Sequence, residues 1–199
     1  DYLAGVYEKL TPAQAQEILK SEFGGLNEVF ADLNVDTGDP KYLKLAETVF
    51  HHDAILGPLK QGRDELDGKH GNTQVPKLVG LARDYLLTGD SADLRGVDTF
   101  WNSVVNQRSF ANGGHGDHEH FFPPHQFPQK LGPQNAETCN TYNMIKLAGM
   151  RFSWAPDAAD MDFVERGLIN HLLTNIGREP GEFGYFLPFG NVAYKTFST

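Results

Sequence analysis

The short turn Thr-Gly-Asp occurs twice in this chain, and this repetition constrains the fold more than any other feature. It stands at residues 37–39 and again at residues 88–90. Each copy separates two segments whose apolar residues recur at helical spacing, and a glycine between such segments ends a helix. A helix–turn–helix unit that repeats along a chain predicts helical hairpins packed in series.

Apolar periodicity and turn residues together predict seven helices. We expect them at about residues 13–23, 26–35, 40–51, 74–87, 92–105, 140–152 and 161–176. The last six form three hairpins with a period of about 50 to 60 residues. The glycine-rich segment 56–73 is expected to be a loop, and the aromatic segment 185–197 is strand-like.

Serial hairpins form either an open α-solenoid or a closed α/α toroid. His70 and Glu137 both lie just before the first helix of a hairpin or in its first turn. In a toroid these helix N-termini would converge on one rim around a common pocket. Long loops rich in histidine and aromatic residues suit an enzyme cleft there. We therefore expect an all-α fold, and specifically an α/α toroid.

Charge and hydropathy exclude several kinds of partner. The formal net charge is −9 and the Lys and Arg residues do not cluster, so neither nucleic acid nor an anionic membrane is expected to bind. No apolar run approaches the roughly 20 residues of a membrane span. A single cysteine excludes an internal disulfide framework.

The length of 199 residues is that of one domain. The chain begins without Met and ends in an aromatic segment without a polar tail. We expect a single, partial domain that is truncated at both ends and belongs to a longer protein.

The loop at residues 106–135 is rich in Gly, His and Pro and much longer than a usual connection, so we expect it to be functional. It contains His115, His118 and His120, with Glu119 among them. One interpretation is a metal cluster of the three histidines, and another is a working carboxylate at Glu119 whose pocket the histidines shape. A third is that Glu119 is a solvated loop charge.

The motif Glu137-Thr138-Cys139 stands at the start of a helical segment. A carboxylate and a thiolate are both acceptable Zn²⁺ ligands. Alternatively, Cys139 is a small buried apolar residue and Glu137 a charge in the first turn of a helix. A glycosidase needs one carboxyl group to protonate the leaving oxygen and a nucleophile or second base opposite it. Glu119 and Glu137 could supply one or both roles.

Three stretches of the chain, in order, resemble the β-L-arabinofuranosidase family of glycoside hydrolases, family 127 with its relative family 146, once a domain of unknown function. They are LKSEFGGLNEVFADL at 19–33, HGNTQVPK at 70–77 and ETCNTYNM at 137–144. The resemblance covers nearly the whole chain and indicates the central part of the catalytic domain.

This resemblance implies an (α/α)6 barrel, of which the three helical hairpins are about half, and a retaining mechanism with a zinc-bound cysteine nucleophile. Glu119 matches the acid/base, although the spacing around it departs from the family's pattern. Glu137 and Cys139 match two of the four zinc ligands, and His70 and Glu137 lie where the family binds its sugar. The family's adjacent Cys-Cys pair, which supplies the nucleophile and the remaining ligands, is expected downstream. We therefore expect an incomplete zinc site and no activity from this chain alone.

The function expected from the resemblance is removal of terminal arabinofuranose from plant glycans or glycoproteins. Its partner would be an arabinofuranosyl oligosaccharide or a glycoprotein glycan. Two alternatives remain open. One is another α/α-toroid sugar enzyme, an epimerase or lyase that uses His70 or another pocket histidine as base without a metal. The other is a catalytically silent carbohydrate-binding module. Family members are cytoplasmic or exported, and any signal peptide would lie upstream.

Overall fold

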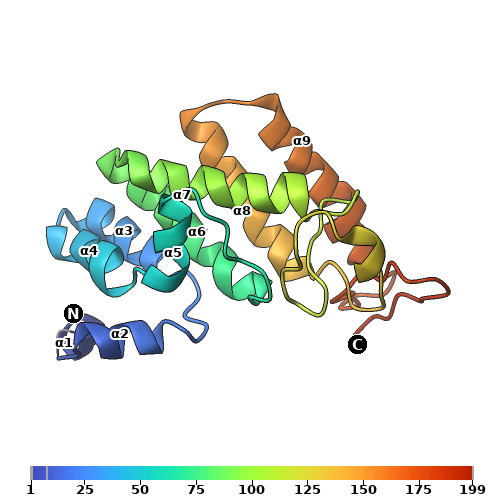
Figure 1. Ribbon diagram of the computed structural model, residues 1–199, viewed down its shortest axis with the longest axis horizontal. Helices are drawn as coiled ribbons and strands as arrows, with labels where there is room; N and C mark the ends of the chain where they lie inside the picture. Colours follow the sequence, from blue (N-terminus) through green and yellow to red (C-terminus); the bar gives the residue numbers. More distant parts are fainter. Residues whose placement is uncertain (1, 8, 199) are drawn as a thin grey trace. The chain divides into compact units, whose positions relative to one another are not determined.

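A computed structural model describes residues 2–7 and 9–198. The chain divides into two compact units, the first made of residues 1–65 and 76–99 and the second of residues 66–75 and 100–199. Within the described residues the regular structure consists of nine α-helices with short π- and 3-10-helical turns, and there are no strands (Figure 1). The all-α expectation is confirmed. None of the described helices is long and apolar enough to cross a membrane.

The helices follow one another with short connections, except before α8. They are α1 Tyr2–Tyr7, α2 Pro12–Ile18, α3 Leu26–Thr37, α4 Pro40–Lys44, α5 Asp53–Lys60, α6 Gly71–Thr88, α7 Ser91–Trp101, α8 Thr138–Trp154 and α9 Ala158–Gly167. Helices α4, α7 and α9 continue directly into π-helical turns at Leu45–Val49, Asn102–Asn106 and Leu168–Leu172. The long segment between α7 and α8 contains one 3-10 turn, Phe127–Lys130.

Local sequence explains several of these boundaries. Thr11 forms a capping box at the start of α2, since its hydroxyl accepts from the Gln14 amide while the Gln14 side chain accepts from the Thr11 amide. Gly38 adopts a left-handed conformation, with φ of 70°, and ends α3. Asp39 then caps α4 by accepting from the amide of Lys41 at 3.0 Å.

The expectation of a loop over residues 56–73 is wrong at its start. Helix α5 occupies this region because Ile55, Leu56 and Leu59 share one buried face. The pair Gly57-Pro58 indicates a helix break in the sequence, but burial of that face outweighs it. Helix α6 also begins three residues earlier than expected, at Gly71.

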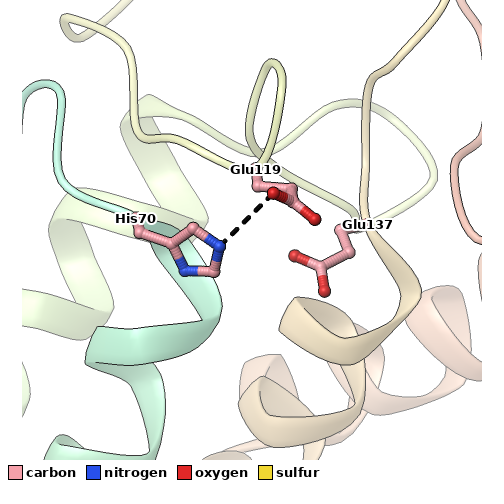
Figure 2. Close-up of side chains that lie close together, drawn as sticks. All are labelled: His70, Glu119 and Glu137. Carbon is pink, nitrogen blue, oxygen red and sulfur yellow. Dashed lines mark ion pairs between the residues drawn. The ribbon is translucent and has the colours of Figure 1, made fainter. Parts of the chain in front are cut away.

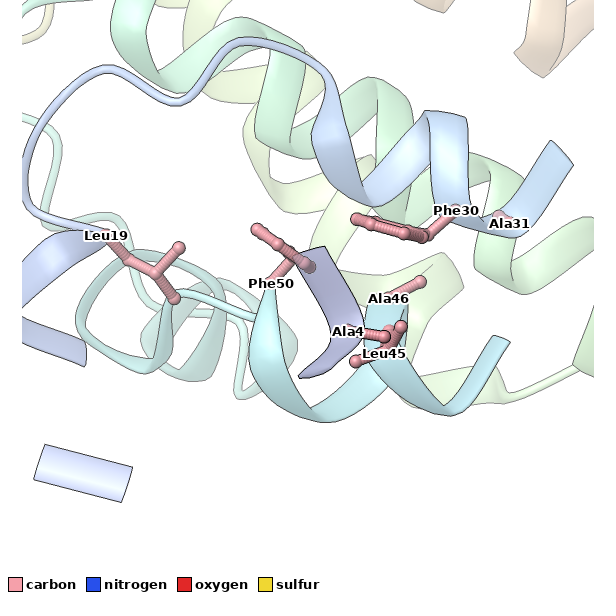
Figure 3. Packing of buried hydrophobic residues seen from close by; sticks show 7 residues of the cluster. All are labelled: Ala4, Leu19, Phe30, Ala31, Leu45, Ala46 and Phe50. Carbon is pink, nitrogen blue, oxygen red and sulfur yellow. The ribbon is translucent and has the colours of Figure 1, made fainter. Parts of the chain in front are cut away.

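The first unit has a core of aromatic and aliphatic side chains. Its buried members are Ala4, Leu19, Phe30, Ala31, Leu45, Ala46 and Phe50 (Figure 3). The rings of Phe30 and Phe50 stack with centroids 4.8 Å apart, and Tyr7 contacts Phe50 edge-on at 4.7 Å. Such pairs stabilise a core beyond the area that they bury.

Helix α3 approaches α6 closely within the first unit. The side-chain amide of Asn27 donates to the carbonyl of Lys77 at 2.8 Å. A Cβ added to Gly80 would lie only 2.0 Å from the Asn27 side chain, so this contact requires glycine.

The second unit combines a helical hairpin with long loops. Helices α8 and α9 run side by side in opposite directions (Figure 1), and Asp157 caps α9 by accepting from the Ala159 amide at 2.9 Å. Phe110, Phe122 and Ala136 form a small core under the loop. The segment expected to be strand-like, residues 185–197, makes only single backbone hydrogen bonds, because its partners are loops and not a sheet edge.

Candidate functional site

Three side chains from distant parts of the sequence converge in the second unit. His70 lies just before α6, Glu119 lies in the long loop, and Glu137 immediately precedes α8. Figure 2 shows the three side chains pointing toward one another. One ligand atom from each lies within 4.8 Å of the others, and these residues form the one such group of three among the described residues.

A first backbone pairing brings His70 beside Glu119. The amide of Gly71 donates to the carbonyl of Glu119 at 2.6 Å, and the amide of Phe121 donates to the carbonyl of Lys69 at 2.9 Å. The segment before α6 therefore runs antiparallel to the segment that carries Glu119. This places the two side chains on neighbouring positions.

A second backbone pairing brings Glu119 toward Glu137. The amide of His118 donates to the carbonyl of Gln134 at 2.8 Å, and the amide of Ala136 donates to the carbonyl of Gly116 at 3.2 Å. The loop is thus pinned on both sides of Glu119, although it contains no regular secondary structure at that point.

The backbone is strained beside both carboxylates. His118, Glu119 and Ala136 have φ values of 49°, 66° and 48°, a region that non-glycine residues rarely occupy. Such strain persists only where surrounding contacts impose it, and it concentrates at functional sites. Ala136 is fully buried, and a Cβ added to Gly114 would lie 2.6 Å from its methyl group. Gly114 therefore gives Ala136 the space that its position before Glu137 requires.

The tautomer of His70 follows from its hydrogen bonds. The backbone amide of Thr73 donates to Nδ1 of His70 at 3.2 Å, and the Thr73 hydroxyl lies 2.9 Å from the same nitrogen. Because Nδ1 accepts a hydrogen bond, the proton of the neutral ring lies on Nε2. Nε2 faces Oε2 of Glu119 at 3.5 Å. His70 therefore presents a donor to the Glu119 carboxylate.

Tyr185 joins the two carboxylates. Its hydroxyl lies 2.7 Å from Oε1 of Glu119 and 2.9 Å from Oε1 of Glu137. Burial and the two carboxylates raise the pKa of Tyr185 above its usual range, so the side chain remains a phenol. A phenol has one proton to donate, and a second short contact to a carboxyl oxygen is favourable when that carboxyl is protonated.

Glu137 is the more deeply buried of the two carboxyl groups, with 1% of its surface exposed. This burial raises its pKa, and the charge of Glu119 acts in the same direction. Hydrogen bonds from the side chains of Cys139 and Tyr185 lower the pKa in opposition. Together these influences leave the pKa of Glu137 above its ordinary value.

The side chains near Glu137 suit a zinc ion chemically. Oε2 of Glu137 is buried and has no hydrogen-bond partner among the described residues. An imidazole, a second carboxylate and, two residues further on, the Cys139 thiol are close to it, and Zn²⁺ prefers these donors. The three residues with ligand atoms close together are His70, Glu119 and Glu137. Cys139 is not one of the three, but its side chain contacts Glu137.

Cys139 is partly exposed, in the first turn of α8. It borders an open hollow of about 390 Å³ together with Asn72 and Asn143. The side-chain amide of Asn143 donates to the Asn72 side chain at 2.9 Å and to the Cys139 carbonyl at 3.2 Å. These two bonds hold the three residues that border the hollow in place. The sulfur therefore lies beside both the Glu137 carboxyl and an accessible hollow.

The three loop histidines do not gather into a metal cluster. His115 is completely buried and stacks on Phe121 with ring centroids 5.3 Å apart, and burial lowers its pKa to about 3. His118 is exposed and pairs with Asp117 at 2.7 Å. His120 contacts the ring of His70 edge-on at 5.3 Å. His118 and His120 flank Glu119 in the chain, and a working role for the Glu119 carboxylate stays a prediction.

Sequence reasoning missed Tyr185 as a site residue. The signal present was the aromatic character of residues 185–197, which was interpreted as a strand. Tyr185 reaches the site because its carbonyl accepts from the Thr138 amide at 3.1 Å and the Leu187 amide donates to Asn135 at 2.9 Å. These contacts cannot be inferred from local periodicity.

Comparison with solved structures defines the class of protein. A GH127 β-arabinofuranosidase matches with a TM-score of 0.71 and 24% identity over 82% of this chain and 27% of that chain. The GH127 β-L-arabinofuranosidase of Geobacillus stearothermophilus T6 matches with a TM-score of 0.64 and 18% identity over 81% of this chain and 30% of that chain. The GH76A α-1,6-mannanase of Salegentibacter sp. HEL1_6 matches with a TM-score of 0.61 and 15% identity over 96% of this chain and 49% of that chain. The fold is that of the α/α-toroid glycoside hydrolases, which confirms the expected architecture.

The family itself follows from the sequence. Residues 1–198 match the family described as β-L-arabinofuranosidase, GH127 catalytic domain. The chain belongs to this glycoside hydrolase family, and the resemblance of its three motifs is confirmed. It spans 27% and 30% of the two GH127 structures that it matches. A search among curated proteins gave no match.

Proposed function

We propose that the protein containing this chain is a retaining β-L-arabinofuranosidase that removes terminal arabinofuranose from plant glycans or glycoproteins. The observation that carries the proposal is the convergence of His70, Glu119 and Glu137 within 4.8 Å, in a chain of the GH127 family. The hydroxyl of Tyr185 supports it by contacting both carboxyl groups.

Glu119 is proposed as the general acid and base. Its side chain is 33% exposed, so a substrate can reach it, whereas Glu137 is buried. The Nε2–H of His70 and the hydroxyl of Tyr185 orient the carboxyl from two sides. In a retaining reaction this group first protonates the leaving oxygen and then takes a proton from water.

Retention of configuration is proposed from the family resemblance, in which the nucleophile is a zinc-bound cysteine. One carboxyl oxygen of Glu119 lies within 4.8 Å of one of Glu137. Because Glu137 is proposed as a zinc ligand, this distance supports a general acid and base beside the proposed zinc site.

Glu137 and Cys139 are proposed as two of the zinc ligands, and Glu137 with His70 as sugar-contacting residues. When bound, zinc would hold a coordinated cysteine as a thiolate at neutral pH. The family resemblance places the nucleophile and the remaining ligands on an adjacent cysteine pair downstream of the residues described. The ligand set within this chain is therefore incomplete.

The proposal is tested with the full-length protein and methyl β-L-arabinofuranoside. Glu119→Gln should lower kcat by about 10² to 10⁴-fold, the usual contribution of general acid–base catalysis. Glu165→Gln, which changes an exposed glutamate of α9, should leave kcat unchanged. Proton NMR of the first product should show the β-anomer. Absence of turnover in zinc-loaded protein would favour the silent binding module, and release of an unsaturated or epimerised sugar would favour the lyase or epimerase.

Zinc binding is tested by metal content, independently of activity. Glu137→Gln and Cys139→Ser should each lower the zinc bound per protein after dialysis, while Glu165→Gln retains it. Circular dichroism should confirm that the variants are folded. Equal zinc contents in all of these proteins would refute the proposed ligands.

A further inference from the structure

A cavity of about 440 Å³ in the second unit is lined in part by Tyr185, the residue whose hydroxyl contacts both carboxyl groups. It is lined mainly by aromatic rings and small polar groups, including Gln134, Tyr185, Phe186, Tyr194, Thr196 and Phe197. Its volume falls in the range of about 300–1,000 Å³ that is typical of small-molecule sites.

Two stretches of backbone build the cavity. Residues 185–190 run beside residues 132–138, where the Leu187 amide donates to Asn135 and the Phe189 amide donates to Gly132, each at 2.9 Å. The chain then turns back, and the amide of Ser198 donates to the carbonyl of Phe183 at 3.0 Å. The aromatic residues between these anchors surround the cavity.

Both sides of the cavity connect to the proposed acid. Tyr185 lines the cavity, and its hydroxyl lies 2.7 Å from Oε1 of Glu119. On the other side, Gln134 accepts a hydrogen bond through its carbonyl from the amide of His118, the residue before Glu119. A molecule in the cavity would therefore border Tyr185, the residue whose hydroxyl contacts the Glu119 carboxyl.

The lining favours a neutral, polyhydroxylated ligand. Tyr185, Tyr194 and Phe197, which all line the cavity, are 40%, 81% and 39% exposed within the described residues. None of the described residues that line the cavity carries a charge. A sugar ring presents an apolar C–H face that can stack on an aromatic ring, and hydroxyl edges that can bond to amide and hydroxyl groups such as those of Gln134 and Thr196.

We propose that this cavity is the subsite for the leaving group of the reaction, and that it holds the neutral sugar to which the arabinofuranose is attached. The inference rests on the proposed function, because a general acid must lie on the side from which the leaving oxygen departs. The cavity is connected to Glu119 through Tyr185, which lines the cavity and contacts that carboxyl group. The aromatic residues of this cavity would then select the leaving group, whereas His70 and Glu137 contact the arabinofuranose.

The test compares two substrates in the full-length protein. One is methyl β-L-arabinofuranoside, whose leaving group cannot fill the cavity, and the other is an arabinofuranosyl disaccharide with the same bond. Phe197→Ala should lower kcat/KM for the disaccharide by about tenfold, mainly through KM, because the leaving-group sugar loses its contact with an aromatic ring. It should change kcat/KM for the methyl glycoside less than twofold. Phe152→Ala, a partly exposed ring of α8 outside the cavity, should affect neither substrate.

Binding is measured without turnover by saturation-transfer NMR. The probes are methyl β-D-galactopyranoside and methyl α-L-arabinofuranoside, as neutral leaving-group sugars. Transfer to at least one of them should be seen with wild-type protein and with Phe152→Ala and be lost in Phe197→Ala. Unchanged transfer in Phe197→Ala, or an equal loss of kcat/KM for both substrates, would overturn the subsite. If wild-type protein hydrolyses neither substrate, the proposed function fails, while selective loss of transfer in Phe197→Ala still supports a sugar site in the cavity.

Discussion

The hydroxyl of Tyr185 lies 2.7 Å from Oε1 of Glu119, although 66 positions of sequence separate the two residues. Tyr185→Phe removes this hydroxyl and keeps the ring. We expect kcat to fall about 10- to 100-fold, the usual effect of losing a group that orients a catalytic residue, with a smaller change in KM. At least one limb of the pH–rate profile, acid or basic, should shift in this variant. A purely structural role of Tyr185 would leave both limbs in place. Tyr2→Phe alters an exposed hydroxyl in α1 and is the control.

Gly114 and Ala136 are packed too closely for a larger residue at position 114. Gly114→Ala would place a methyl group 2.6 Å from the Ala136 methyl and 2.9 Å from Nδ1 of His171. We expect the free energy of unfolding to fall by about 1–3 kcal/mol through overpacking, with a loss of activity because Ala136 precedes Glu137. Urea denaturation measures the first effect.

The control for this change lies in α8. A Cβ added to Gly149 meets no atom within 4 Å, so Gly149→Ala should raise helix stability by up to about 1 kcal/mol. If Gly114→Ala were as stable as wild type, the packing at Ala136 would not constrain the site in the way described.

Two buried histidines should make the protein sensitive to acid. Burial lowers the pKa of His115 to about 3 and that of His171 to about 4, below the ordinary value of 6.5. As the pH falls below about 6.5, the unfolded chain takes up protons at these sites while the folded protein does not. The free energy of unfolding should therefore decrease from pH 6.5 toward pH 4, by about 1.4 kcal/mol per pH unit for each fully shifted site.

His115→Phe should remove part of this slope. The ring of His115 stacks on Phe121, and neither of its nitrogens has a hydrogen-bond partner among the described residues, so phenylalanine fits the environment. Stability measured by urea denaturation at pH 7 and pH 4.5 should differ less in this variant than in wild type. His125→Asn, which removes an exposed imidazole at a position with φ of 62°, should keep the wild-type difference.

Lys77 should add a dependence of the same sign at high pH. The side chain is completely buried, donates to the Leu19 carbonyl at 3.2 Å and lies 2.8 Å from Nδ1 of His52. Burial lowers its pKa from 10.5 to about 8. Between these values the folded protein loses a proton that the unfolded chain still holds, so stability should rise with pH across this window, by on the order of 1–3 kcal/mol.

Lys77→Met tests this contribution. The variant should be less stable at pH 7, by about 1–3 kcal/mol, because the Leu19 carbonyl loses a buried donor. The difference between wild type and variant should widen from pH 8 to pH 10. Lys20→Met, at an exposed lysine, should show no such pH-dependent difference.

Local sequence determined most of the helices. The caps at Thr11 and Asp39 and the left-handed Gly38 are short-range features, and the structure has helices beginning or ending where they predict. Helix α5 was missed because Gly57-Pro58 indicates a break when read locally. The burial of its apolar face, which stabilises the helix, is a property of the folded unit.

The chemistry of the site could also be anticipated in part. His70, Glu119 and Glu137 were candidates because of their residue types and their positions near helix starts or in a long loop, and the structure brings these three together. Their catalytic and zinc-binding roles remain predictions. The loop histidines could not be sorted from sequence, because burial alone separates His115 from the exposed His118.

By itself the sequence determined the helical hairpins, the family and the side chains that bear the chemistry, because helix periodicity, caps and motifs act over a few residues. Only the tertiary structure decided how those side chains meet. The positive φ at Glu119 and Ala136, and the contact of Tyr185 with both carboxyl groups, depend on hydrogen bonds between segments far apart in the chain. Such long-range pairings leave no periodic signal in the sequence, because they consist of single hydrogen bonds between irregular loops.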